Sequence, residues 1–450
     1  MLPNRSLYAS GRLSLVALAL LALQALQAMA ASPSSPLRVG TSGDYAPFSD
    51  SDGGLHGFDI AVARAFAEER EQEIEFVTFR WPKLLRDLGA DRFDVAMSGI
   101  TIRPERSAAG RFSLPVIETG AVLLVNEART WRDASEANHK RIRIAVNAGG
   151  HLERVAHEHF PEAVLVVIPD NRAVLRALVD GKVEAVLTDS VEAPGWLRKA
   201  EGFRALGPFT RDRKAFLLAP DADALAADLD GWLLDREADG TLAKLRALHF
   251  GAKAAAAARI ATPLRGLLAS IDERLSLMPL IGLAKRREGY PLEVPEREKF
   301  VLDTAVANMR LSAEVNRVTP PPEDAVRAFF QAQMEAAKEV QWNAVRAATP
   351  GAETPLLSLD GSLRPALIRI GERINRLLLA LPDELDPVAV SSAANEQLRS
   401  SHLSRPTRKR LADAITAFVA ANASPEMAPS DGGSKAPASV TPFEPRRGSR

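Results

Sequence analysis

The chain has 450 residues, of which 46% are apolar, and this length predicts about three domains of ordinary size. Its 57 basic residues are balanced by 57 acidic residues, so the composition gives no indication of nucleic-acid binding. The absence of cysteine excludes disulfides and thiolate chemistry, and the seven histidines form no spaced ligand set, so we expect no structural metal.

An export signal is predicted at the N-terminus. Arg5 and Arg12 precede a short apolar run at 13–26, and Ala28-Met29-Ala30 has the small-x-small pattern of a cleavage site. The run is short for a membrane span and no positive anchor follows it, although a retained anchor is the alternative. We therefore expect residues 1–30 to be a signal peptide, and the mature chain to work outside the cytoplasm without stable membrane association.

Residues 37–251 alternate between strand and helix patterns, which indicates an α/β fold. An apolar stripe at helical spacing (Phe58, Val62, Phe66) marks one helix. The predicted strands are Leu37–Thr41, Ile74–Phe79, Phe93–Met97, Ala121–Asn126, Arg141–Val146 and Lys214–Leu218. Two further helices are predicted at Trp81–Leu88 and Asp230–His249.

A candidate anion site follows the buried strand Phe93–Met97. Ser98 and Thr101 stand where the strand ends, and ligands of open α/β sheets bind outside the carboxyl ends of strands. Arg106 adds a guanidinium that can hold a carboxylate with two parallel hydrogen bonds. The alternative is an ordinary turn with a solvated arginine.

A similar helix-turn-strand unit occurs twice, at 85–99 and at 175–189. The repeat favours two similar lobes, although any such unit looks alike. We expect the chain to cross between the lobes near residues 122 and 212, which would create a hinged cleft. The expected lobes are residues 37–122 with 212–251, and residues 123–211.

Beyond Thr262 the strand patterns disappear and an all-helical domain is predicted at 262–422. An alanine-rich linker at 252–261 precedes it, and a tail at 424–450 has too few large apolar residues to fold. The expected helical segments are 264–287, 295–317, 322–347, 364–382 and 387–422.

Three motifs of the α/β half resemble the periplasmic cyclohexadienyl dehydratases: GDYAPF at 43–48, WPKLLRDLGADRFDVAMSGITI at 81–102 and TDSVEA at 188–193. The resemblance covers about residues 37–251. It implies a two-lobed, periplasmic-binding-protein-like (type II) α/β domain in the periplasm. It also implies the loss of water and carbon dioxide from prephenate or arogenate, which gives phenylpyruvate or phenylalanine.

The same resemblance implies that Glu192 protonates the departing ring hydroxyl, with a pKa raised by a closed, partly apolar cleft. The alternative is a solvated carboxylate at a helix start. His151 stands where the family often has threonine, which affects the anion contacts of the second lobe. The other implied roles are a carboxylate contact for Arg106 with Ser98 and Thr101, a second anion contact for Lys214, an ammonium contact for Asp189, and ring walls for Tyr45 and Trp81.

The helical half has its own set of polar residues. Arg274 and Lys285 are eleven residues apart, or ~16 Å along a straight helix, so both could face one side. Arg297, Gln341 and Arg364 lie on later helices. The alternative is that these residues belong to solvated helix faces.

Four segments of this half, in order, resemble the secreted, all-helical chorismate mutases: ERLSLMPLIGLAKRRE, VPEREKF, FFQAQMEAAKEVQ and LRPALIRIGERINRLL. The resemblance covers about residues 262–422 and implies that one chain supplies a whole active site. The implied roles are carboxylate binding by Arg274 and Arg364, donation to the ether oxygen by Lys285 and Gln341, positive charge from Arg297, and a hydroxyl contact for Glu298. Val294 departs from relatives that carry an aspartate there.

These observations predict a bifunctional, exported enzyme without cofactor or metal, which converts chorismate to prephenate and prephenate onward. Its expected partners are these small molecules and no nucleic acid. One alternative is an amino-acid-binding protein with a helical interaction module, and another is a mutase joined to a prephenate sensor that performs no turnover.

Overall fold

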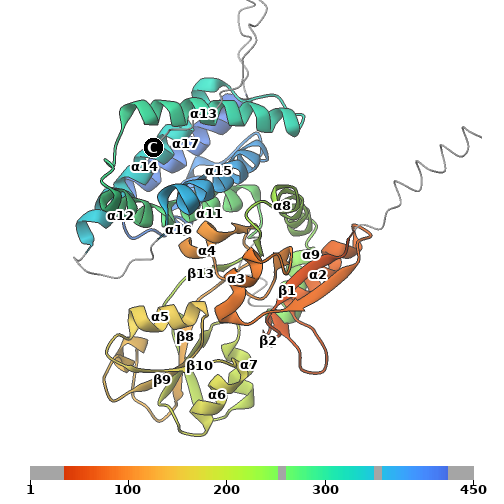
Figure 1. Cartoon of the computed structure of the whole chain (residues 1–450), viewed down its shortest axis with the longest axis vertical. Helices are drawn as coiled ribbons and strands as arrows, with labels where there is room; N and C mark the ends of the chain where they lie inside the picture. The colour runs from red at the N-terminus through yellow and green to blue at the C-terminus, as the bar shows by residue number, and fades with distance from the viewer. Residues whose placement is uncertain (1–34, 252–259, 349–356, 424–450) are drawn as a thin grey trace, which may run out of the picture.

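The structure is a computed structural model that describes residues 35–251, 260–348 and 357–423. It contains a two-lobed α/β part and an all-helical part, which lies against the first lobe (Figure 1). The predicted signal peptide, most of the predicted linker and the predicted tail lie outside the described residues. Within the described ranges, we find no helix that combines the length and the apolar character needed to cross a bilayer.

The first lobe is built on a five-stranded sheet with the order β4-β1-β5-β14-β6. Strands β4, β1 and β5 are parallel, and β14 runs antiparallel to its neighbours. The strands are β1 (Leu37–Thr41), β4 (Ile74–Thr78), β5 (Val95–Ala96), β6 (Arg111–Phe112) and β14 (Leu217–Leu218), with the small pair β2 (Asp44–Tyr45) and β3 (Ser49–Asp50) beside them. The helices are α2 (Phe58–Glu68), η1 (Trp81–Lys83), α3 (Leu84–Gly89), α4 (Pro104–Ala109), α8 (Asp223–Ala238) and α9 (Thr241–Phe250).

The second lobe repeats this plan with the order β10-β9-β11-β8-β12. The predicted repeat is confirmed, because its two strands, β5 and β11, are both the central strand of their sheets. The elements are β8 (Ala121–Asn126), η2 (Ala134–Ala137), β9 (Arg143–Asn147), α5 (His151–His159), β10 (Val164–Ile168), α6 (Arg172–Val179), β11 (Ala185–Asp189), α7 (Ala193–Lys199) and β12 (Phe203–Leu206).

The chain crosses between the lobes through a two-stranded sheet made of β7 (Ile117–Thr119) and β13 (Asp212–Lys214). The predicted strand Lys214–Leu218 is wrong as a single element, because it spans the end of β13 and the start of β14 in two different sheets. Lys214 therefore belongs to the connection between the lobes.

The all-helical part consists of seven α-helices within its described ranges. A short π-helical segment, η3 (Leu359–Leu363), leads directly into the fifth of them, α15. Helices α12 and α14 approach closely at Gly282, where an added Cβ would lie 3.1 Å from the carbonyl oxygen of Gln341. The helices are α11 (Pro263–Ser276), α12 (Met278–Glu288), α13 (Pro295–Val315), α14 (Glu323–Ala347), α15 (Arg364–Leu379), α16 (Pro387–Gln397) and α17 (Arg405–Ala423).

Three predicted helices are interrupted in the structure. The helix expected at 230–249 is divided at Gly240, which has the left-handed φ of 83° that glycine adopts readily. The helix expected at 264–287 is divided at Leu277, next to Pro279 in the first turn of α12, where the missing N–H is harmless. The segment expected at 387–422 forms α16 and α17 with a connection between them.

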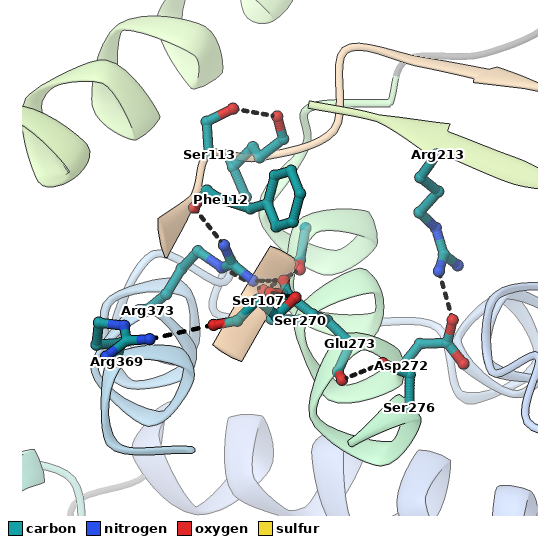
Figure 2. Close-up of polar contacts among 12 residues, drawn as sticks. Ser107, Phe112, Ser113, Arg213, Ser270, Asp272, Glu273, Ser276, Arg369 and Arg373 are labelled. Atoms are coloured by element: carbon teal, nitrogen blue, oxygen red, sulfur yellow. Dashed lines mark hydrogen bonds and ion pairs between the residues drawn. The ribbon is translucent and has the colours of Figure 1, made fainter. Parts of the chain in front are cut away.

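The first lobe and the helical part share a continuous apolar core, and a buried polar cluster crosses their boundary (Figure 2). Arg373 on α15 forms an ion pair with Glu273 on α11 and donates to the carbonyl oxygen of Phe112 at 2.6 Å. Ser107 on α4 donates to Glu273 at 2.8 Å. Arg213 lies 2.5 Å from Asp272, so the connection between the lobes also contacts the helical part.

Two candidate active sites

A narrow cavity lies between the two lobes. Its volume is about 30 Å³, which is room for about two water molecules. Five predicted site residues meet there: Tyr45, Trp81, Thr101, Arg106 and Lys214. The other lining residues are Gly99, Asn147, Gly150, His151, Leu152 and Asn171.

Arg106 is a buried cation on α4 with no carboxylate in ion-pair distance among the described residues. Its Nη1 donates to the carbonyl oxygen of Thr101 at 3.0 Å, and its guanidinium lies 5.9 Å from the Trp81 ring centre. Burial lowers the pKa of Arg106 below its usual range, and the nearby charge of Arg103 adds to this effect. The solvated alternative is therefore wrong, and Arg106 is suited to bind a carboxylate that enters the cleft.

Lys214 and Asp189 form a buried ion pair at the base of the cleft. Lys214 Nζ lies 3.0 Å from Asp189 Oδ2, donates to Thr101 Oγ1 at 2.8 Å and donates to the Tyr45 hydroxyl at 3.4 Å. Thr119 also donates to Asp189, at 2.9 Å. Lys214 was predicted to contact a second anion and Asp189 to contact an ammonium group, but in this structure the two side chains neutralise each other.

Glu192 is a buried carboxyl group at the start of α7, with 3% of its surface exposed. Its Oε1 accepts from Asn171 Nδ2 at 2.8 Å and its Oε2 accepts from Thr188 Oγ1 at 2.5 Å. Burial raises the pKa of Glu192 to about 8, although the two hydrogen bonds oppose the shift and the charges of Asp189 and Asp44 favour it. The solvated alternative is wrong, and the group is a proton donor at neutral pH.

Ser98 does not line the cavity, in contrast to the prediction. Its hydroxyl lies 2.8 Å from Ser42 Oγ and 2.7 Å from Ser49 Oγ, within a buried cluster of serines. The N–H of Gly99 donates to Asp59 Oδ2 at 2.6 Å, so it is also not available to an anion. Ser98 therefore shapes the strand end from behind, and Thr101 is the hydroxyl of this stretch that reaches the cleft.

Sequence reasoning missed Asn171 and Asp59. Asn171 precedes α6 and contacts both Glu192 and, across the cleft, the carbonyl oxygen of Asp44 at 3.2 Å. Burial raises the pKa of Asp59 to about 7, while the Gly99 N–H and Lys214 oppose that shift. An aspartate in the apolar stripe of α2 was the one signal for Asp59, whereas nothing near Asn171 in the sequence marks it.

The two lobes touch around the cleft. Arg154 of the second lobe lies 2.5 Å from Glu105 of the first, and Gly149 lies against Pro82. Gly149 has a φ of 70°, and a Cβ there would come within 2.7 Å of the Pro82 backbone. A substrate larger than two waters therefore requires the lobes to separate before it enters.

A second, larger cavity of about 210 Å³ lies among helices α11 to α15. It brings together all six residues predicted for this half, which come from five helices. Its lining residues are Arg274, Met278, Ile281, Lys285, Tyr290, Pro291, Leu292, Val294, Arg297, Glu298, Val301, Met334, Ala337, Lys338, Gln341, Leu359, Arg364 and Leu367.

Two polar side chains at this cavity lack partners among the described residues. Arg274 is half-buried, its Nη1 atom is inaccessible and has no hydrogen-bond partner, and burial lowers its pKa to about 10, so it stays charged at neutral pH. Gln341 donates weakly to Met278 Sδ at 3.4 Å, while its Oε1 has no partner. Since unpaired buried polar groups are unfavourable, both are prepared to bind a polar ligand.

The remaining cations are held at the rim of the same cavity. Lys285 Nζ donates to the carbonyl oxygen of Leu292 at 2.8 Å, and Arg364 pairs with Asp360. Burial lowers the pKa of Lys285, and the charges of Arg297 and Arg364 lower it further.

Lys338 is a lining cation that sequence reasoning missed. It lies 3.2 Å from Glu298 and 3.0 Å from Glu335, so it competes for the carboxylate that was predicted to meet a substrate hydroxyl. Its position three residues before Gln341 on α14 was the available signal.

The comparisons with known proteins agree with this division. Residues 37–252 match the bacterial extracellular solute-binding proteins of family 3, and residues 259–342 match chorismate mutase type II. A cyclohexadienyl dehydratase of Pseudomonas aeruginosa is 36% identical over 213 residues, which are 46% of this chain and 79% of that protein. An arginine-binding protein of an Escherichia coli ABC transporter is 27% identical over 217 residues, which are 46% of this chain and 88% of that protein.

Among solved structures, an ancestral amino acid-binding protein, described as a precursor of cyclohexadienyl dehydratase, is 32% identical to this chain. The TM-score is 0.46, and the match covers 48% of this chain and 96% of that chain. Both predicted resemblances are confirmed by the family matches and the dehydratase relative. The chain belongs to the bacterial extracellular solute-binding proteins of family 3, where it is similar to a cyclohexadienyl dehydratase, and its helical part carries a chorismate mutase type II region.

Proposed function

We propose that this chain is a bifunctional enzyme of aromatic amino acid synthesis. The helical part, residues 262–422, isomerises chorismate to prephenate. The two-lobed part, residues 37–251, dehydrates and decarboxylates prephenate to phenylpyruvate. The dehydratase relative and the mutase-type match support the two activities.

The mutase step needs no acid, base or nucleophile. One C–O bond of chorismate breaks while one C–C bond forms, and no proton is exchanged. Arg274 and Arg364 would hold the two carboxylates in the folded conformer, which removes orientational freedom before the reaction. Lys285 and Gln341 would donate to the ether oxygen as negative charge develops on it.

The dehydratase step needs one proton. Glu192 would give its proton to the ring hydroxyl, the C–O bond would break, and water would leave. The ring carboxylate would leave as carbon dioxide, and the electron pair of its C–C bond would complete the aromatic ring. Glu192 then regains a proton from solvent, so one proton is consumed for each water and carbon dioxide released.

The burial of the Glu192 carboxyl group between the lobes is the observation that carries the dehydratase proposal. Burial raises the pKa of Glu192 to about 8, so this group can donate a proton at neutral pH, and it is held by Asn171, which lines the cleft cavity. The ion pair of Lys214 with Asp189 supports prephenate over arogenate, because the carboxylate that would meet an ammonium already has a cation.

The location of the enzyme is part of the proposal. Residues 1–30 have the pattern of a signal peptide, and the solute-binding family to which the chain belongs is described as extracellular. We infer that the mature protein works in the periplasm.

The test is to incubate the purified chain with chorismate and, separately, with prephenate, and to measure prephenate and phenylpyruvate. Glu192→Gln should abolish phenylpyruvate formation and leave the mutase step intact, and Lys285→Ala should do the reverse. If the wild-type chain binds prephenate but forms no phenylpyruvate, the two-lobed part is a sensor or binding domain. If each variant loses both activities, the sites are not independent.

A further inference from the structure

His151, the first residue of α5, lines the cleft cavity, and neither of its ring nitrogens has a hydrogen-bond partner among the described residues. Its Nε2 lies 3.1 Å from Asp212 Oδ1, and Asp212 is fixed in turn by Thr210, which donates to Oδ2 at 2.9 Å. Both ring nitrogens are buried, and neither makes a well-aligned hydrogen bond with the described residues, so the contact of Nε2 with Asp212 is one of charge and distance. Because Nε2 is the nitrogen next to Asp212 and His151 lines the cavity, Nδ1 is the nitrogen left for a molecule that binds there.

The cleft has one unpaired cation for a substrate with two carboxylates. Prephenate, the substrate of the proposed function, carries two. Arg106 can hold the first, because it has no carboxylate partner among the described residues. Lys214 is already neutralised by Asp189, with both side chains buried. The remaining basic side chain at the cavity is His151.

Resting on the proposed function, we propose that His151 binds the second carboxylate of the substrate through Nδ1 and takes up one proton from solvent as the substrate binds. A neutral imidazole has one N–H, and the position of Asp212 places it on Nε2. Nδ1 then carries a lone pair, which cannot donate to a carboxylate. The imidazolium has an N–H on both nitrogens, so it can bind Asp212 and the substrate together.

The surroundings of His151 keep the ring neutral until the substrate arrives. Burial lowers its pKa, and the charges of Lys214 and Arg103 lower it further, while Asp212 opposes the shift. Arg106 also lines the cavity, and the N-terminal dipole of α5 disfavours a cation at its first residue. A substrate carboxylate beside Nδ1 reverses this balance, because an adjacent anion favours the charged form.

The proton can be counted by calorimetry on the Glu192→Gln chain, which should bind prephenate without consuming it. Titrations at about pH 7.5 in two buffers of different ionisation enthalpy give the number of protons taken up, and we expect about one. The matched control is the Glu192→Gln chain with His151→Asn, since asparagine offers a neutral donor of similar reach. Prephenate that binds at the mutase site contributes equally to both and cancels in the difference, which we expect to be about one proton.

A second measurement does not depend on a variant. The value of kcat/KM for prephenate in the wild-type chain should fall about tenfold per pH unit from about pH 6.5 to 7.5, because the free enzyme must be protonated at His151. An unchanged kcat/KM over this range, or equal proton uptake by the two calorimetry chains, overturns the proposal. Failure of the proposed function looks different, since prephenate would then bind with uptake of one proton and yield no phenylpyruvate.

Discussion

Glu192→Gln should change the pH dependence of stability as well as abolish dehydration. The pKa of Glu192 is raised by burial from 4.5 to about 8 in the folded chain. Between these values the folded state holds a proton that the unfolded state has released. Stability therefore falls as the pH rises from 4.5 toward 8, and the full penalty is present above the folded pKa. Glutamine has no proton to lose, so the variant escapes this penalty.

The size of the effect follows from the pKa difference. At about pH 7, some 2.5 units above the unfolded value, the penalty in the wild-type chain is about 3 kcal/mol. Glutamine keeps the shape of the side chain and one acceptor oxygen for Thr188 or Asn171, so it forfeits roughly 1 kcal/mol of hydrogen bonding. We expect the variant to be more stable than wild type by about 2 kcal/mol near pH 7, and equal or slightly less stable near pH 4.5.

Urea unfolding of both chains across this pH range, followed by tryptophan fluorescence, measures the difference. Trp81 and Trp196 are buried in the two lobes and report on their opening. The dehydration rate of the variant should fall by about 10² to 10⁴, as for the loss of a general acid. If the stability difference stays constant from about pH 4.5 to 8, Glu192 is ionised in the folded chain and the assignment of the acid is wrong.

Three further substitutions test other parts of the structure. Gln341→Glu should make mutase activity fall as the pH rises, because a glutamate must be protonated to donate a hydrogen bond. The wild-type rate should show no such fall, and equal pH profiles of the two chains would show that Gln341 takes no part in the reaction. Gly149→Ala should disfavour the left-handed turn by ~1–2 kcal/mol and push the lobes apart at Pro82. The value of kcat/KM for prephenate should therefore fall about tenfold, while mutase activity stays normal. An unchanged kcat/KM for prephenate would show that lobe closure does not depend on this contact. Glu273→Ala should lower the free energy of unfolding by ~3–5 kcal/mol, because it leaves Arg373 buried without its carboxylate partner. Urea unfolding measures this loss. A loss below ~1 kcal/mol, as for an exposed ion pair, would contradict the buried character of the pair.

The sequence predicted the architecture where the pattern is local. Apolar runs and turns marked most strands, and the repeat at 85–99 and 175–189 correctly indicated two lobes with related central strands. Arg106 was singled out because it follows a strand end, and the six residues proposed for the mutase step were singled out through the order of four helical segments. All six line one cavity, so helical spacing and resemblance together were enough to predict that they lie close together.

The sequence could not predict what depends on distant partners. The burial of Glu192 is set by Asn171 and Thr188, and only the fold brings Asn171 to the helix start of α7. Ser98 was assigned to the cleft because it follows a strand, yet the hydroxyls of Ser42 and Ser49 hold it inside the lobe. Predicted helices were too long wherever a residue such as Gly240 ended one helix, because the apolar period continues across the break.

Strand β13 shows why the two halves are more than neighbours on one chain. Successive side chains of a strand point to opposite faces, so Asp212 and Lys214 face the cleft while Arg213 between them faces the helical part. There its guanidinium lies 2.5 Å from Asp272 and donates to Gln397 Oε1 at 2.8 Å. A buried arginine needs such partners, and the described residues of the two-lobed part offer it only Glu118, at 3.6 Å. The helical part therefore completes the strand that carries Lys214, which lines the cleft, and Asp212, which contacts His151 of the cleft, so the two halves are joined by a packed interface as well as by the chain.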